Sequence, residues 1–223
     1  DGATNKSSGA VTVSGENVTS RNAFEIFGGS LGFSASFTVN DGVADAAFSA
    51  TISNAGATDG DITSGADGTV DITASTVTID ALGDVGSLDN TTNIDITASS
   101  EVNISAGKTG VDSDAKVNIN SIGALKLGHV QIRSDTLDVT GEKIAITSSG
   151  DVTDNNDDTN ANLTAGAIDL RVATGSAIGA AGNAIDIASL ASSSALVIQD
   201  AASADTVTGA RFSGLHIITD QDF

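Results

Sequence analysis

The sequence predicts an all-β protein, a β-solenoid of about six coils with roughly 20–25 residues in each coil. The first observation is a pattern in 68–147, where an apolar–polar–apolar triplet is followed, after a gap, by a second such triplet. The second is a composition with 39% hydrophobic but only 3% aromatic residues and no Pro. The third is the lack of long apolar stripes with helical period, which argues against helices.

The repeat occurs in four copies. From copy to copy the first triplet advances by 24, 23 and 20 residues and the second by 25, 23 and 19. The copies are Val70-Asp71-Ile72 with Val77-Thr78-Ile79, Ile94-Asp95-Ile96 with Val102-Asn103-Ile104, Val117-Asn118-Ile119 with Leu125-Lys126-Leu127, and Leu137-Asp138-Val139 with Ile144-Ala145-Ile146. If each copy is one coil, successive coils place four residues one above the other: Val70, Ile94, Val117 and Leu137.

The chain divides into three predicted segments. Residues 1–60 form a strand-rich cap or a contact with another subunit, 61–210 form the solenoid, and 211–223 form a final strand or cap. The first segment holds most of the Phe residues and a strictly alternating strand at 31–39. Since the end of a solenoid exposes unpaired backbone, this segment either covers that end or joins the next copy. The candidate self-association residues are Phe24, Phe27, Leu31, Phe33, Phe37 and Val39.

The net charge of the chain limits the classes of molecule that it is expected to bind. Its 29 acidic and 9 basic residues give a formal net charge of −20, which argues against a nucleic-acid partner because no basic patch can neutralise phosphates. No apolar run reaches the roughly 18–20 residues of a membrane-spanning helix. The chain has no Cys, so disulfides do not indicate its compartment. No secretion signal is visible, so we expect a removed leader or an excerpt of a longer protein.

The middle residues of the triplets are mostly acidic. We expect these side chains to point outward and to form a column along the stacked coils, either as a solvated acidic face or as a place where cations gather. The residues of this column are Asp71, Asp95, Asn118, Asp138, Asp169 and Asp186.

A second candidate cation site lies in the longest irregular insertion. Asp154, Asn156 and Asp158 have the alternate spacing that opens a calcium-binding loop. Thr159 stands where such a loop has its turn Gly, and Ala165 stands where it has its closing Glu. The segment is therefore not an EF-hand, and the alternatives are Ca²⁺ binding or an ordinary polar insertion.

One segment resembles a known family. Residues 163–190 alternate apolar and polar positions around a glycine turn, as do the repeats of large secreted bacterial exoproteins of the filamentous haemagglutinin type. The matching turn residues are Gly175, Ser176, Ile178 and Gly179, with Ala177 as an insertion. The resemblance covers about 68–200. It implies a right-handed parallel β-helix on the outside of a bacterium, in adhesion or matrix.

These observations favour an extracellular structural protein, a subunit that self-assembles into a bacterial surface fibre, sheath or matrix. The alternative is a rod within a large secreted adhesin that binds a surface glycan or host ligand. A polysaccharide-cleaving enzyme is the third reading, but His129 and His216 are the sole histidines and no carboxylate pair stands out, so we predict no enzymatic activity. An antiparallel β-sandwich is the alternative fold, although its hairpin turns are scarce.

Overall fold

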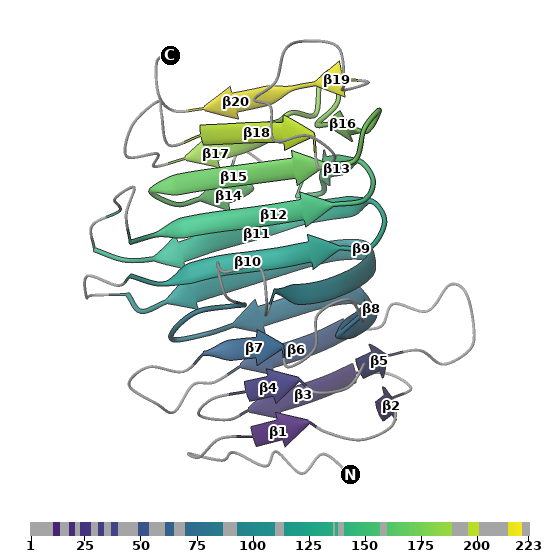
Figure 1. Ribbon diagram of the computed structural model, residues 1–223, viewed down its shortest axis with the longest axis vertical. Coiled ribbons are helices and arrows are strands. Elements are labelled where there is room, and N and C mark those ends of the chain that lie inside the picture. The colour runs from purple at the N-terminus through teal and green to yellow at the C-terminus, as the bar shows by residue number, and fades with distance from the viewer. Residues whose placement is uncertain are drawn as a thin grey trace.

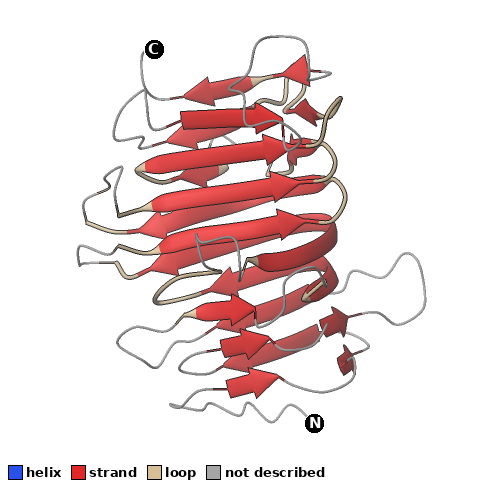
Figure 2. Cartoon of the chain, in the orientation of Figure 1, coloured by secondary structure: helices blue, strands red, loops and turns tan. Residues whose placement is uncertain are grey.

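The computed structural model describes residues 11–13, 18–20, 23–27, 31–33, 37–39, 49–53, 61–64, 70–86, 93–109, 114–135, 137, 141–156, 160–188, 196–200 and 214–219, and for the strands up to residue 53 it describes the backbone. Within these ranges all regular structure is β, with no helix, and parallel strand pairs build a β-solenoid (Figures 1 and 2). The predicted all-β solenoid is confirmed. In the same ranges no helix is long and apolar enough to cross a membrane.

The first ladder of parallel strands runs the length of the molecule. Each strand pairs in parallel with the next, and Val85 bridges β7 to β10 where the ladder lacks a full strand. Its strands are β1 (Val11–Val13), β4 (Leu31–Phe33), β7 (Ile62–Ser64), β10 (Lys116–Ser121), β12 (Lys143–Ser148), β15 (Ala167–Val172) and β18 (Leu196–Asp200).

The second ladder is shorter, because it joins the first at the end of β10. Its strands are β2 (Val18–Ser20), β5 (Phe37–Val39), and the first parts of β8 (Ile72–Asp80) and β9 (Ile94–Gly107). From β10 onward each coil therefore has one strand where the earlier coils have two, one in the first ladder and one in the second. The strands between 11 and 53 belong to the same ladders as those that follow them.

The third ladder closes the coil and later divides into two. It begins with β3 (Ala23–Phe27) and β6 (Ser49–Ser53), continues through the second parts of β8 and β9, and reaches β11 (Leu125–Arg133). One branch from β11 contains β13 (Val152–Asp154), β16 (Ala177–Ile178) and β19 (Gly214–Leu215). The other branch contains β14 (Leu163–Thr164), β17 (Ile185–Ala188) and β20 (Ile217–Thr219).

The core is a set of aliphatic stacks between the ladders. Every second residue of a strand points inward, so residues of the same inward position lie one strand spacing, about 4.8 Å, apart along the axis. One stack contains Val117, Ile144 and Ile168, which are at most 1% exposed. Because β-branched side chains fit a pleated surface and fill a narrow interior, Val and Ile dominate these stacks.

The predicted stacking of the repeat is confirmed for its first two copies, where Ile72 pairs with Ile96 and Val77 with Val102, and was wrong beyond them. Ile94 pairs with Ile119, while Val117 pairs with Val85 below and Ile144 above. The triplet that begins at Ile144 therefore continues the ladder of 117–119 and not that of 125–127. Leu137 packs partly buried against the core, and 138–140 lie outside the described residues. The solenoid itself remains, because the pairing is parallel from coil to coil with a different assignment of triplets.

The register has one irregularity at a glycine, Gly128. Between Leu127 and Val130 the pairing of β11 with β9 shifts, so that Gly128 and the residue after it face the single residue Asn103. A Cβ atom at Gly128 would overlap the side-chain oxygens of Asn103 and Glu101, so a larger residue here would require these two side chains to move. The bulge marks the point where the third ladder divides.

Asp and Asn side chains join coils where the backbone ladder turns a corner. Their side-chain oxygens accept hydrogen bonds from backbone N–H groups one coil further along, at donor–acceptor distances from 2.7 to 2.9 Å. The acceptor–donor pairs are Asp61–Asp84, Asp84–Lys116, Asp71–Asp95, Asn103–His129, Asp151–Ala177 and Asn162–Asp186. A buried N–H that lacks a partner costs free energy, so these carboxylates and amides stabilise the corners.

Candidate functional site

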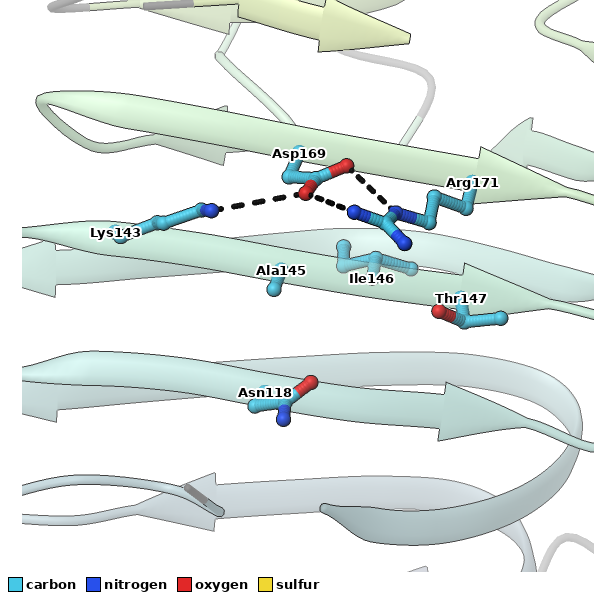
Figure 3. Close-up of a pocket in the computed structure, with 7 residues that line it drawn as sticks. All are labelled: Asn118, Lys143, Ala145, Ile146, Thr147, Asp169 and Arg171. Atoms are coloured by element: carbon cyan, nitrogen blue, oxygen red, sulfur yellow. Dashed lines mark hydrogen bonds and ion pairs between the residues drawn. The ribbon is translucent and has the colours of Figure 1, made fainter. Parts of the chain in front are cut away.

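A small polar pocket lies on the outer face of the first ladder, across β10, β12 and β15 (Figure 3). The strand register places Asn118, Ala145 and Asp169 directly one above the other. The middle residue of this column is the small one, so a cavity of about 90 Å³ opens over it. Lys143 and Arg171 flank the cavity on either side.

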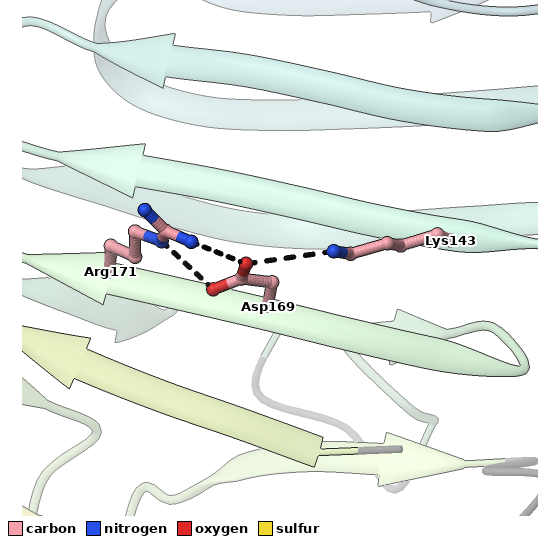
Figure 4. Close-up of polar contacts among 3 residues, drawn as sticks. All are labelled: Lys143, Asp169 and Arg171. Atoms are coloured by element: carbon pink, nitrogen blue, oxygen red, sulfur yellow. Dashed lines mark hydrogen bonds and ion pairs between the residues drawn. The ribbon is translucent and has the colours of Figure 1, made fainter. Parts of the chain in front are cut away.

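Asp169 holds two cations together at this pocket (Figure 4). Arg171 donates from Nε to Asp169 Oδ1 at 3.0 Å and from Nη2 to Oδ2 at 2.9 Å, which is a bidentate pair. Lys143 Nζ lies 3.6 Å from the same Oδ2. The hydrogen bonds to Asp169 raise the pKa of the Arg171 guanidinium above its usual value. The three residues thus form a cluster with two positive charges and one negative charge.

The lining of this pocket is charged. Its lining contains one carboxylate, Asp169, and that group is occupied by two cations. Hydrolysis of a glycosidic bond generally uses two carboxyl groups, one of them able to give up a proton. The lining of this pocket does not include that pair of carboxyl groups.

The structure places two of the three calcium candidates together at a corner of the third ladder. Asp154 Oδ1 accepts a hydrogen bond from the backbone N–H of Asn156 at 2.9 Å and from Asn162 Nδ2 at 2.7 Å. Asp158 lies outside the described residues. Among those that are described, no group of three or more His, Cys, Asp or Glu side chains is placed to hold a metal ion. Calcium binding at this corner therefore stays a prediction.

Asn162 is the residue of this corner that sequence reasoning missed. It is fully buried, and its Nδ2 also donates to the carbonyl oxygen of Gly128 at 3.1 Å, while its Oδ1 accepts from the N–H of Asp186. The only available signal was its position directly before the apolar Leu163, which many polar residues of this chain share. The corner is thus a hydrogen-bonded structural element centred on one amide.

The prediction that the middle side chains of the triplets form one continuous, solvated column was wrong. Asp71, Asp95, Asn118 and Asp169 are only 2%, 1%, 4% and 8% exposed. Of these, Asp71 and Asp95 are direct neighbours, while Asn120 and not Asn118 lies above Asp95.

Hydrogen bonding explains this burial. Asp71 Oδ2 accepts from the backbone N–H of Asp95, and Asp95 Oδ1 accepts from the side-chain amides of Asn93 and Asn120. Asp186 is on the third ladder, next to Asn162, and Asp138 lies outside the described residues. These acidic side chains therefore bind neighbouring donors instead of forming one solvated face.

The candidate self-association residues lie in strands of the first two coils. Phe24 and Phe27 are in β3, and the remaining four are in β4 and β5, with their side chains outside the described residues. β4 pairs with β1 and β7, and β5 pairs with β2 and β8, so both backbone edges of these strands are occupied. β3 pairs with β6, and its other edge has no described partner.

Comparisons with protein-family models, with curated proteins and with solved structures find no match to this chain.

Proposed function

We propose that the chain is a structural subunit that assembles end to end by parallel β-strand pairing. The observation that carries this proposal is that the strands at both ends of the solenoid have an unpaired edge. In the described part of the chain, β1, β2 and β3 at one end and β18, β19 and β20 at the other each pair along one edge only. An unpaired strand edge is a template for another strand.

The two ends match in strand direction and in ladder. β1 and β18 belong to the first ladder, and β3 and β20 belong to the third, with every pair between them parallel. A second copy moved along the long axis therefore meets the first with strands in the same direction. Such a head-to-tail contact does not close on itself and produces a filament.

Apolar side chains at the C-terminal end support the same joint. Leu196, Ile198 and Ile217 pack only partly buried against the core, and Ile218 on β20 is 59% exposed. Covering them with the first coil of another copy would remove apolar surface from water, which is favourable. Phe24 and Phe27 of β3 are the candidate residues on the opposing end. The other four candidates would contribute as side chains only, since the backbone edges of their strands are already paired.

The winding is right-handed in this proposal, as in the exoproteins that the repeats resemble, with about six coils over 61–210. The subunit acts outside the cell, as a bacterial surface fibre, sheath or matrix. The resemblance of 163–190 to those repeats supports this location and also the alternative, a rod in a larger adhesin that binds a surface glycan or host ligand. Neither function is enzymatic.

Electron microscopy and sedimentation of the purified protein test the assembly. The two large exposed hydrophobic residues of the described chain give a matched pair, since Ile218 is on an end strand and Ile122 is at a turn on the side. We expect filaments from the parent, short or no filaments from Ile218→Lys, and normal filaments from Ile122→Lys. Monomers of the parent under all salt and Ca²⁺ conditions, or equal filaments from both variants, would contradict end-to-end assembly.

A further inference from the structure

The pocket over Ala145 contains more hydrogen-bond donors than acceptors. The ammonium group of Lys143 has three N–H donors, yet within the described residues its one ion pair is the 3.6 Å contact with Asp169. The guanidinium group of Arg171 has five, and its contacts with Asp169 use Nε and Nη2. Their side chains are 36% and 42% exposed, so a ligand can reach the donors that remain.

The pocket has the size and shape for one small charged group. Its volume of about 90 Å³ compares with about 30 Å³ per molecule in liquid water, so it has room for a carboxylate. Figure 3 shows the side chains of Lys143 and Arg171 extending toward each other along β12 and β15, with Ala145 between them and Asn118 on the next strand. Thr147 adds a hydroxyl group to the lining.

Local charge selects the sign of the ligand. The chain as a whole carries a formal charge of −20, which repels anions, whereas this pocket has two cations and one carboxylate. An anion that enters gains two attractions against one repulsion. The planar fork of an arginine side chain matches the two oxygens of a carboxylate especially well.

We infer that this pocket binds the carboxylate of a small acidic solute, such as a uronic acid sugar or a simple organic acid, with Lys143 and Arg171 as its cationic contacts. The site lies on the side of the solenoid, and its lining contains no residue of an end strand, although β15 pairs with the end strand β18. Asp169 orients Arg171 and also weakens the binding of an anion by repulsion. Its removal therefore has an effect opposite to that of removing either cation.

Equilibrium dialysis with radiolabelled galacturonate tests this inference on monomers and filaments alike. We expect saturable binding of galacturonate, no binding of the neutral sugar galactose, and weakening by added salt. Acetate distinguishes the two sources of the carboxylate: full competition at equal concentration assigns the affinity to the carboxylate alone, and weaker competition assigns part of it to the sugar ring. Both results support a carboxylate site.

Four variants test whether galacturonate binds in this pocket. Removing one charge at about 4 Å in water corresponds to about a fivefold change in affinity, so Lys143→Gln and Arg171→Gln are each expected to raise the Kd about fivefold. Asp169→Asn is expected to lower the Kd. Lys126→Gln removes an exposed charge from β11 on another ladder and is expected to leave the Kd unchanged.

Far-UV circular dichroism verifies that each variant is folded. Absence of saturable binding to the parent, equal binding of galactose, or equal weakening by Lys126→Gln and Lys143→Gln would overturn the inference.

Discussion

Replacing Asn162 by alanine tests whether the corner of the third ladder depends on one buried amide. The side chain is 0% exposed and joins three parts of the chain. Its Nδ2 donates to Asp154 Oδ1 at 2.7 Å and to the Gly128 carbonyl oxygen at 3.1 Å, and its Oδ1 accepts from the N–H of Asp186 at 2.9 Å. The same Nδ2 also donates to the Leu127 carbonyl oxygen at 3.3 Å. Alanine removes the bonds of all three polar groups of the amide, its two N–H and its oxygen, and leaves the Asp186 N–H inside the corner without this acceptor.

The expected loss of stability follows from these contacts. A typical hydrogen bond contributes about 1 kcal/mol net, so three give about 3 kcal/mol, and a buried donor or acceptor left unsatisfied costs about 1–3 kcal/mol. The two estimates together predict that Asn162→Ala lowers the free energy of unfolding by about 4–6 kcal/mol. Asn103, two coils below in the same column, is the matched control, because it is half-buried and bonds the N–H of His129 at 2.8 Å. Asn103→Ala is expected to cost about 1 kcal/mol.

Urea unfolding followed by circular dichroism near the β-sheet band measures both variants, since the chain has no Trp or Tyr for fluorescence. The slope of the free energy against urea must stay the same for the midpoints to report stability. If Asn162→Ala costs no more than Asn103→Ala, the corner does not depend on the buried amide, and the reasoning is refuted.

Two further substitutions test the acidic corners and the glycine at Gly86. Burial raises the pKa of Asp84 above 3.8, so its stabilising contribution is present at low pH and is lost as the pH rises through the folded pKa. Asp84→Asn keeps an acceptor for the N–H of Lys116 and removes the carboxylate charge. It should therefore raise the midpoint of thermal unfolding at pH 7 but not near pH 3. Equal shifts of the midpoint at both pH values would contradict this prediction. Gly86 has φ +71°, and a Cβ atom there would overlap the Asn118 carbonyl oxygen. Gly86→Ala should therefore lower the free energy of unfolding in urea by about 2–4 kcal/mol. The control, Gly175→Ala, should lower it by about 1–2 kcal/mol, because Gly175 also has positive φ but no heavy atom is near. The reverse order would show that the contact at Gly86 relaxes easily.

Local alternation predicted several strands correctly, because period-two patterns depend on neighbouring residues alone. The strand predicted at 31–39 was wrong as one element, since β4 and β5 belong to different ladders. Val77 and Ile79 point inward at 0% and 1% exposure, and they stack on Val102 and Ile104, as the repeat predicts. The same holds for the absence of helix in the described chain. These features needed no knowledge of which coil lies above which.

Beyond the first two copies of the repeat the register between coils could not be predicted, because insertions at the corners change the length of each coil. The ladder lacks a full strand at Val85, and the pattern of triplets contains no mark of this bridge. The burial of Asp71 and Asp95 has the same origin, since their donors come from neighbouring coils. From the sequence alone, a carboxylate between two apolar residues is expected to be exposed to solvent, because its hydrogen-bond partners on other coils are not known.

The pocket was also beyond the reach of sequence patterns. Asp169 and Arg171 are two residues apart and share a face of one strand, so their pairing could have been noticed. Lys143 and Ala145 join them only through the register of β12 with β15. The cavity depends on a small side chain between two larger ones in a column that runs across three coils, and such a column is not visible in linear order.

The direction of the backbone hydrogen bonds has a mechanical consequence. In a stacked solenoid they point along the long axis, from each coil to the next, whereas the strands run across it. A tensile load on the two ends of such a rod therefore peels one coil at a time instead of shearing many bonds together. Arg133 resists this peeling locally, because its side chain extends past Gly107 on the neighbouring coil. It binds Asp80 and the carbonyl oxygen of Ala81 two coils away, and so connects three successive coils.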